Sequence, residues 1–345
     1  MKHFFKSWIL LVAVSLTIIS CNNDDDNSGL PTPQGKYDLG YIISNEGNFG
    51  SPTASVSFLS ADFATLENGI YANANNGNSL GDVLNHFTTN ENFAFLVLNN
   101  SNKIEVVNRF TFEKVATISE EIELPRFAAA NDNVLYISNS GSQSITVYSL
   151  TDFSLLRKIE LNKSVEQLEL TDNYLFVQNA SFGTGKEITP IKVSDFSVEQ
   201  AINLPDNINA IEEEDDILYV LHQSGVSKFN INSKQKITTI PFADGFTGVS
   251  KFDVEDNFIY FTQGSSIYKN ATNANIMTAT ALVDTNADGA SWGVGYGFAV
   301  EEDHIFYTDV NGFTENSDVM IYNLEGELIQ SITTGIGANG VEFND

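Results

Sequence analysis

Oxygen-rich and amide-rich segments are the parts of this sequence that could do chemistry. Asp284, Asn286 and Asp288 alternate along the chain with the spacing that begins a calcium-binding loop. The helix-loop-helix form of that loop needs a carboxylate at its twelfth position, where this chain has Gly295. The segment therefore contains only the first part of a calcium motif, and no other metal is expected.

Signatures of catalysis are few. The histidines after the first twenty residues, His86, His222 and His304, lack the paired spacing of metal ligands. The chain has neither a G-x-S-x-G nucleophile elbow nor a phosphate-binding glycine loop. Cys21 is the only cysteine, so no thiol pair is available for a disulfide. We therefore expect a binding protein without a cofactor, and not an enzyme.

A recurring polar side chain is the most regular candidate for ligand binding. It ends the second expected strand of each of seven similar units: Asn45, Asn99 (displaced by one position), Asn139, Asn179, His222, Gln263 and Asp309. One such group per unit would place a polar ring around the mouth of a central channel. Alternatively these are turn residues that bond their own loops, as Asn and Asp often do. His222 and Gln263 favour the ring, because neither is a typical turn residue.

Aromatic and amide side chains also gather in the loops expected near that ring. The candidates are Glu46, Asn48, Phe49, Phe182, Trp292, Tyr296 and Phe313. Amphipathic aromatics flanked by amides suit a large, flat, partly apolar ligand, although each aromatic alone could be a packing residue. Arg126 is one of few cations in these loops, and could pair with a phosphate, a carboxylate or the surrounding acids.

A repeated β unit must position these residues. Acidic turns recur at 91–92, 132–133, 172–173, 215–216, 256–257 and 302–303, and their second residues are 41, 40, 43, 41 and 46 positions apart. Another 42 positions reach Asp345. Alternating β-branched and aromatic residues around the turns predict strands, with no helical period. Seven such units predict an all-β fold, a seven-bladed β-propeller with four antiparallel strands per blade.

The two ends of the repeat predict how the ring closes. Val341 to Phe343 has the pattern of an inner strand, whereas the first unit, from Tyr37, lacks one. We expect the C-terminal strand to close the first blade, because this leaves no sheet edge open. The short acidic turns then lie on one rim. The loops that leave each second strand and the crossovers between blades lie on the other rim, where the sequence is more variable.

The first 36 residues predict export. Residues 1–20 have the basic start and short apolar run of a signal peptide. Ile18 to Cys21 resembles a bacterial lipobox, which predicts acylation of Cys21; an ordinary signal peptide with a chance cysteine is the alternative. Residues 21–36 form an acidic flexible tether, and residues 37–345 the propeller. Asp24 to Asp26 resembles the export signal of lipoproteins on the outer face of the outer membrane, with a plain linker as the alternative.

The composition restricts the partners. The chain has 45 acidic and 17 basic side chains, a formal net charge of −28, which disfavours nucleic acid and anionic lipid. Membrane contact is therefore expected only through the lipid anchor. Hydrophobic residues make up 42% of the chain, enough for a folded core.

The opening of the first unit resembles a known family. Tyr41 to Gly50, Leu80 to Asp82 and Asn100 to Val106 resemble Bacteroidetes surface lipoproteins of the BtuG type. Leu135 to Asn139, followed by Ile145 to Tyr148, is similar to the YncE-like seven-bladed propellers. The resemblance implies a protein that captures cobalamin or a related corrinoid and hands it to a TonB-dependent outer-membrane transporter. It implies no ligand contacts beyond the opening segment.

Two other functions remain open at the level of sequence. One is an interaction scaffold in a surface complex. The other is a propeller enzyme, such as a lactonase, a lyase or a quinone-dependent dehydrogenase. A lactonase needs a metal held by convergent carboxylates, and one tryptophan beyond the signal peptide gives poor support for tryptophan-docked quinoprotein blades.

Overall fold

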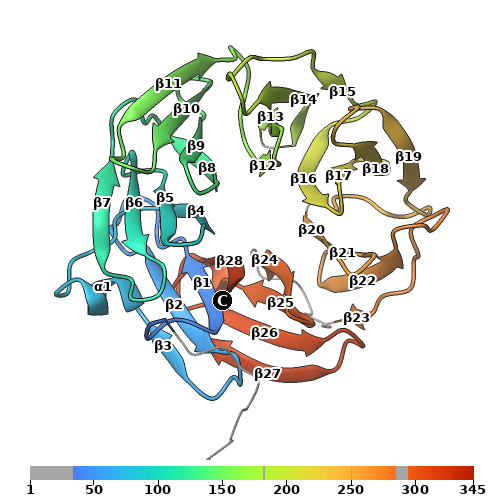
Figure 1. Cartoon of the computed structure of the whole chain (residues 1–345). Helices are drawn as coiled ribbons and strands as arrows, with labels where there is room; N and C mark the ends of the chain where they lie inside the picture. Colours follow the sequence, from blue (N-terminus) through green and yellow to red (C-terminus); the bar gives the residue numbers. More distant parts are fainter. Residues whose placement is uncertain (1–33, 182, 250, 285–293) are drawn as a thin grey trace, which may run out of the picture. The chain divides into compact units, whose positions relative to one another are not determined.

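The computed structural model describes residues 34–345 except 182, 250 and 285–293. The described residues from Gln34 onward form one compact unit, in which seven four-stranded antiparallel sheets surround an axis (Figure 1). The predicted seven-bladed β-propeller is therefore confirmed.

The first three blades are built from the following strands, each blade given from the axis outward. They are β28 (Ala338–Asn344), β1 (Gly40–Asn45), β2 (Ser55–Ser60) and β3 (Leu66–Asn68); β4 (Leu84–Thr89), β5 (Phe93–Leu98), β6 (Lys103–Asn108) and β7 (Lys114–Ile118); β8 (Pro125–Ala130), β9 (Val134–Asn139), β10 (Ser144–Ser149) and β11 (Leu155–Glu160).

The other four blades follow the same order from the axis outward. They are β12 (Leu168–Leu170), β13 (Tyr174–Ser181), β14 (Thr184–Lys192) and β15 (Ile202–Asn203); β16 (Ile208–Glu214), β17 (Ile217–His222), β18 (Gly225–Asn230) and β19 (Lys236–Pro241); β20 (Lys251–Glu255), β21 (Phe258–Gln263), β22 (Ser266–Ala271) and β23 (Val283–Asp284); β24 (Val294–Glu301), β25 (His304–Asp309), β26 (Asp318–Asn323) and β27 (Leu328–Thr333).

The acidic turns between first and second strands are tight hairpins. Both central residues have positive φ in the turns at 215–216, 256–257 and 302–303. Such turns match the right-handed twist of the strands and favour Asn, Asp and Gly, which tolerate positive φ. The recurring acidic pairs thus have a local physical cause. Because every blade has the same antiparallel strand order, all these turns lie on one side of the disc, which we call the acidic face.

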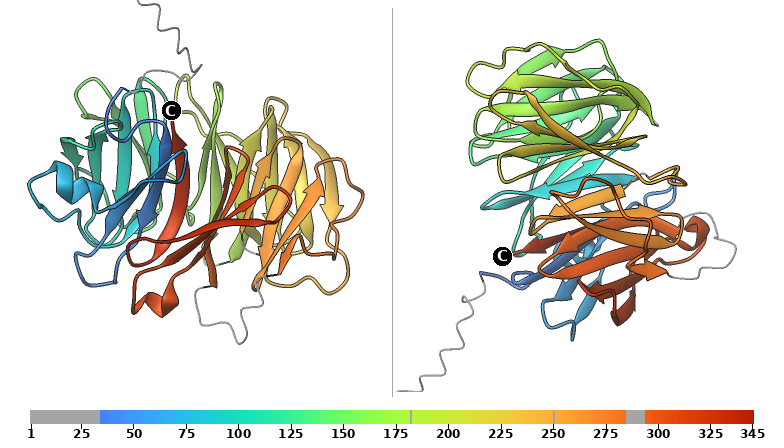
Figure 2. Two further views of the ribbon diagram at one scale, coloured as in Figure 1. Left: turned by 90° about the horizontal axis from the view of Figure 1, so that it is seen from below. Right: turned by 90° about the vertical axis from the view of Figure 1, so that its right-hand side faces the viewer.

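The opposite side of the disc carries the longer connections (Figure 2). Because the strands of each blade are antiparallel, the loops after the second strands and the crossovers between blades lie there together. We call this side the crossover face. The crossover from blade 1 to blade 2 contains a short helix that the sequence did not predict, α1 (Ile70–Ala74), and a 3-10 turn (Asn311–Phe313) follows β25. None of the helices in the described part of the chain has the length and apolarity to span a membrane.

Aromatic side chains pack the blades against one another. At the closing junction between blades 7 and 1, the Tyr41 ring centroid lies 4.7 Å from that of Phe306 and 5.0 Å from that of Phe343. Tyr41 and Phe306 are fully buried. Burial of such rings from both sides stabilises the ring of blades without a disulfide.

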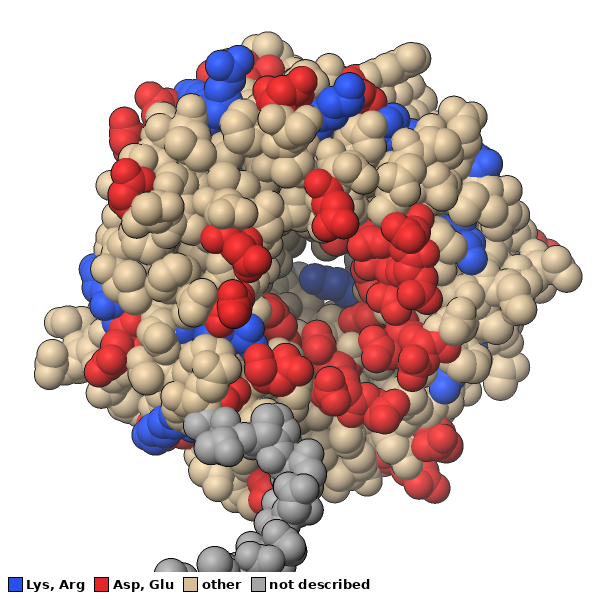
Figure 3. Space-filling model, viewed as in Figure 1, with Lys and Arg blue, Asp and Glu red and all other residues tan. Residues whose placement is uncertain are grey.

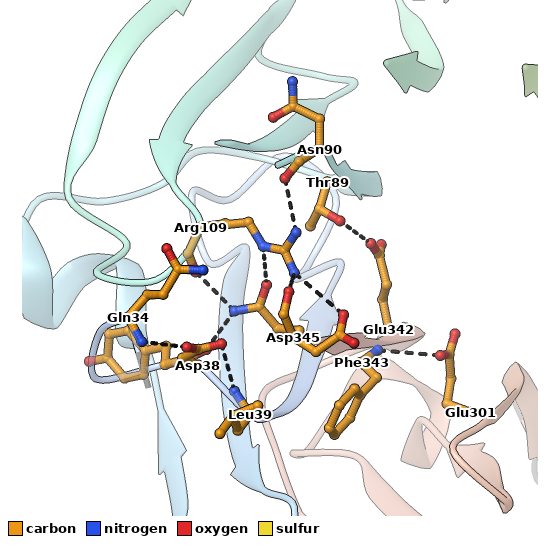
Figure 4. Close-up of polar contacts among 12 residues, drawn as sticks. Gln34, Asp38, Leu39, Thr89, Asn90, Arg109, Glu301, Glu342, Phe343 and Asp345 are labelled. Carbon is orange, nitrogen blue, oxygen red and sulfur yellow. Dashed lines mark hydrogen bonds and ion pairs between the residues drawn. The ribbon is translucent and has the colours of Figure 1, made fainter. Parts of the chain in front are cut away.

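The C-terminal strand closes the first blade, as predicted. β28 pairs with β1, with Phe343 opposite Tyr41 and Val341 opposite Ile43. A polar clasp fastens its end (Figure 4). Arg109 donates from Nε to Asn344 Oδ1 (2.7 Å), and also to the carbonyl oxygens of Asn90 (3.0 Å) and Asp345.

Asn344 extends the clasp to the start of the propeller. Its Nδ2 donates to the carbonyl oxygens of Tyr37 (2.6 Å) and Arg109 (3.1 Å). The clasp therefore joins the first residues of blade 1, a turn of blade 2 and the chain terminus on the acidic face.

Candidate functional site

A cavity of about 670 Å³ occupies the propeller axis. Residues of all seven inner strands line it, and the view from the acidic face shows it as a hollow with basic atoms visible at depth (Figure 3). This volume lies within the range of small-molecule sites, about 300–1,000 Å³. The cavity is therefore the candidate site.

At its crossover end the cavity carries one polar side chain from each blade. These are Asn85, Arg126, Glu166, Asn209, Lys251, Tyr296 and Asn339, which recur every 40 to 45 residues. Of these seven, only Arg126 and Tyr296 are among the residues predicted from the sequence. The missed residues share a sequence signal, a polar residue near the start of each inner strand with the period of the blades.

Irregular pairing of the inner strands aims these side chains at the axis. The register with the second strand shifts between Leu84 and His86 in β4, and between Ile208 and Ala210 in β16, which leaves Asn85 and Asn209 as extra residues. Similar shifts occur in β8, β24 and β28, around Arg126, Tyr296 and Asn339. β-Bulges re-aim side chains and occur often beside functional sites. In five of the seven inner strands, the pairing register with the second strand is thus irregular at the crossover end of the cavity.

Arg126 ties three blades together at this end. Its Nε donates to Glu166 Oε2 (2.8 Å) and its Nη1 to Asn85 Oδ1 (2.6 Å). Burial raises the pKa of Glu166, and the positive charge of Arg126 opposes that rise. Arg126 therefore pairs with an acidic side chain of the protein itself, Glu166, which was one of the three partners considered for it from the sequence.

Glu46 and Tyr296 meet at the cavity wall, as the sequence suggested for the ligand face. The Tyr296 hydroxyl donates to Glu46 Oε2 (2.5 Å), and its ring packs edge-on against Phe313 at 5.0 Å. Burial raises the pKa of Glu46, whereas the hydrogen bond from Tyr296 and the charges of Arg126 and Lys251 lower it. This group offers carboxyl and aromatic surface to a ligand.

The other end of the cavity is lined by carboxyl groups that link neighbouring blades. The acids are Glu169, Glu212, Asp253, Glu301 and Glu342. Glu212 accepts the backbone N–H of Val254 (2.7 Å), and Asp253 that of Val300 (2.8 Å). Burial raises the pKa of Glu301 to about 9, of Glu169 to about 8 and of Glu342 to about 7. Some of these groups therefore carry protons at neutral pH.

No group of three or more potential metal ligands converges among the residues that the structure describes. Asp284 is the exposed last residue of β23, and the other two candidate calcium ligands, Asn286 and Asp288, lie outside the described residues. Phe182, Trp292 and Cys21 also lie outside them. The calcium and acylation predictions are therefore untested.

The predicted polar ring at the channel mouth does not form at the ends of the second strands. An inner strand lies between each of these strands and the axis, and the side chains of Asn45, Asn139, Asn179 and His222 are buried within their blades. Each bonds a hydroxyl group of the neighbouring third strand: Ser57, Thr146, Thr189 and Ser227, respectively. These four side chains therefore bond inside their blades, to partners on the third strand, whereas the alternative interpretation placed their bonds in their own loops.

Gln263 and Asp309 each accept a backbone hydrogen bond, Gln263 from the preceding crossover and Asp309 from its own loop. Gln263 Oε1 accepts the N–H of Thr247 (3.0 Å), and Asp309 Oδ1 accepts that of Asn311 (2.9 Å). In the loop after β1, the N–H of Asn48 donates to Thr53 Oγ1 (2.8 Å), whereas the Phe49 side chain is 81% exposed. Of these side chains, Phe49 is exposed, whereas Asn48, Gln263 and Asp309 are half-buried.

An aromatic pocket of about 400 Å³ adjoins the axial cavity and was missed by the sequence analysis. Phe242 and Phe246 line it, with ring centroids 5.5 Å apart. Gly183 and Asn209 line both hollows, so an apolar surface continues directly from the polar mouth. The crossover face thus combines a polar opening with an aromatic wall.

Fold and cavity together define a seven-bladed propeller with a polar axial site open to its loop-rich face. The sequence matches the model of one family over residues 39–337, and the protein belongs to that family, Domain of unknown function (DUF5074). The family description names no ligand or activity. No curated protein matches the sequence.

Solved structures show the same architecture. A quinonprotein alcohol dehydrogenase-like protein from Bacteroides thetaiotaomicron is 14% identical, with a TM-score of 0.68 over 90% of this chain and 80% of its own. BamB from Moraxella catarrhalis is 12% identical, with a TM-score of 0.56 over 91% and 88% of the two chains. The dihydro-heme d1 dehydrogenase NirN is 11% identical, with a TM-score of 0.60 over 92% and 78%. At these identities the likeness establishes the fold alone.

Proposed function

We propose that this protein binds cobalamin or a related corrinoid on its crossover face, over the mouth of the axial cavity. The observation that carries the proposal is the direct junction of a polar opening with an aromatic pocket, through Gly183 and Asn209. A corrin is broad and apolar on its faces and carries amide groups on its edge. Its face suits Phe242 and Phe246, and its edge suits the amide and charged groups of the mouth.

The resemblance of Tyr41 to Gly50 supports this choice of ligand. In the structure this segment supplies Glu46, which lines the cavity, and Phe49, which is exposed on the same face. The segment that carries the resemblance is therefore part of the proposed site. The proposal is one of binding without chemical conversion, as the sequence analysis predicts.

Titration calorimetry with cyanocobalamin tests the proposal. Phe246→Ala should weaken binding about tenfold, equivalent to about 1.4 kcal/mol, because it removes one wall of the aromatic pocket. Phe258→Ala makes the same change at the acidic-face end of β21 and should leave the affinity unchanged. Melting curves of both variants control for folding. Absence of heat with the unmodified protein at micromolar ligand would refute the proposal.

The resemblance also supports delivery of the ligand to a TonB-dependent outer-membrane transporter by a lipid-anchored protein. Tyr37 bonds Phe110 and Asn344 on the acidic face, so the chain enters the propeller on the side opposite the proposed site. A tether attached there leaves the crossover face free for the ligand and the transporter. Cys21→Ser should move the protein from the outer-membrane fraction to the soluble fraction, and retention in the membrane would contradict the anchor.

A further inference from the structure

Lys251 is a cation of the cavity wall without an ionic or hydrogen-bonding partner among the residues that the structure describes. It begins β20 and lines the axial cavity, and the Tyr296 ring lies 5.9 Å from its Nζ. Burial lowers the pKa of Lys251; Glu46 opposes this decrease and the positive charge of Arg126 adds to it. Lys251 is half-buried, and the Tyr296 ring and the charge of Glu46 near its ammonium group replace its lost contact with water only in part.

Several other lysines of the described chain have a partner. Lys103 and Lys192 form ion pairs with Glu105 and Glu199, at 2.8 and 2.9 Å. Lys228, which is more deeply buried than Lys251, donates to the carbonyl oxygen of Thr272 (3.1 Å). A desolvated charge without a partner costs free energy. In a chain with 45 acidic side chains, an unpaired lysine that faces a cavity indicates a partner that arrives with the ligand.

We propose that the crossover end of the axial cavity binds an anionic group of the ligand, a phosphate or a carboxylate, on Lys251 with Arg126 beside it. The anion site lies in the same cavity as the proposed corrinoid site, rests on that proposed function, and assigns an anionic group to the ligand. Arg126 uses Nε and Nη1 for Glu166 and Asn85, and no bond of its Nη2 occurs within the described chain. Nη2 can therefore donate to the anion, and charge-assisted bonds of this kind are strong.

Two nearby carboxyl groups do not prevent anion binding. Glu166 is paired with Arg126, and Glu46 accepts the hydroxyl of Tyr296. Burial raises the pKa of both acids, so each is protonated more readily than a free glutamate. The ammonium of Lys251 is then the charge at this end that is left to be matched.

The charge distribution sets the direction of entry. Five carboxyl groups line the far half of the cavity, and acidic side chains surround its opening on the acidic face (Figure 3). The acidic side chains around that opening repel an anion that approaches from the acidic face. An anion therefore reaches Lys251 from the crossover face, where the aromatic pocket can hold the rest of the same ligand.

Two corrinoids and inorganic phosphate test the proposal. Cyanocobalamin carries a phosphodiester in its nucleotide loop, whereas dicyanocobinamide has the same corrin without that loop. The unmodified protein should bind cyanocobalamin at least about tenfold more tightly. Lys251→Met should remove that difference and leave the affinity for dicyanocobinamide unchanged. Lys186→Met, at an exposed lysine whose Nζ bonds Pro205 O, is the control and should change neither affinity.

The phosphate arm separates the two proposals. Inorganic phosphate at low ionic strength should raise the melting temperature of the unmodified protein and of Lys186→Met, but not of Lys251→Met. Acetate in its place distinguishes a carboxylate site from a phosphate site. Equal binding of both corrinoids to the unmodified protein, with no phosphate effect, would overturn the anion site while the corrinoid function stands. Phosphate binding that depends on Lys251 without corrinoid binding would support the anion site and refute the corrinoid function.

Discussion

The stability of the ring should depend strongly on Arg109, which holds the C-terminal strand in place. Its side chain is 10% exposed, and it donates to Asn344 Oδ1, to Asn90 O and to Asp345 O. Arg109→Met keeps most of the length of the side chain and removes all these donors. Asn344, itself 1% exposed, would then keep a buried oxygen without a donor.

The expected loss follows from these contacts. A hydrogen bond from a charged donor contributes about 1.5–3 kcal/mol, and an unsatisfied buried acceptor costs a similar amount. The oxygen of the exposed Asp345 can return to water, so we count only the bonds to Asn344 and Asn90, for a loss of about 3 kcal/mol. For about 310 residues that each contribute about 2 cal/mol/K to the entropy of unfolding, this loss lowers the melting temperature by about 5 °C.

Differential scanning calorimetry of Arg109→Met measures this effect. Arg157→Met is the matched control, because Arg157 is exposed on the outer strand β11 and should tolerate the change. Removal of residues 338–345, and with them β28, should have a larger effect than either and leave no cooperative transition of the complete ring. A melting temperature of Arg109→Met within about 1 °C of the control would refute the role of the clasp.

Three further predictions address the site and its surroundings. Asn139→Ala should lower the free energy of unfolding in urea by about 2 kcal/mol without changing cyanocobalamin affinity, because Asn139 is buried and bonds Thr146 and the N–H of Glu123 inside the protein. A loss of affinity with unchanged stability would instead place Asn139 in the ligand site. Tyr296→Phe should weaken cyanocobalamin binding about fivefold in calorimetry, since it frees the Glu46 carboxyl at the mouth; an unchanged affinity would place the ligand elsewhere. The free energy of unfolding should decrease as the pH rises from about 5 to about 9. Burial raises the pKa of Glu301 to about 9 and of Glu169 to about 8 from an ordinary 4.5. The folded state therefore holds protons that the unfolded state releases over this range. This stabilisation is complete below the pKa of the unfolded state and is lost as the pH rises through the pKa of the folded state. Glu301→Gln should reduce the dependence of the unfolding free energy on pH, measured by urea titrations at several pH values. A stability that increases with pH over this range would contradict the reasoning.

The fold could be predicted from the sequence because its signals are local. The hairpins at Asp215-Asp216 and Asp256-Asn257 need two successive residues with positive φ, and few residue types tolerate that conformation. Their recurrence therefore gave the number of blades. The unpaired strand patterns at Tyr37 and at Val341 then predicted the closure that β28 makes.

The cavity could be predicted only in part, because its side chains are placed by strand pairing. Asn85 and Asn209 point to the axis where the register of an inner strand shifts, and such a shift is set by its partner strand. Lys251 has ordinary neighbours in the sequence, and its lack of a partner is visible only in three dimensions. Conversely, Asn139 and His222 have the residue types of a ligand site, but their hydroxyl partners lie across the hairpin and hold them inside the blade.

The position of a bound corrinoid tests the account most directly. A crystal of the protein with cyanocobalamin, measured at the cobalt absorption edge, gives the place of the metal without reference to the surrounding density. We predict one anomalous peak on the crossover face, over the mouth bounded by Tyr296, Asn209 and the aromatic pocket. A peak on the acidic face, or no peak at saturating ligand, would contradict the proposed site.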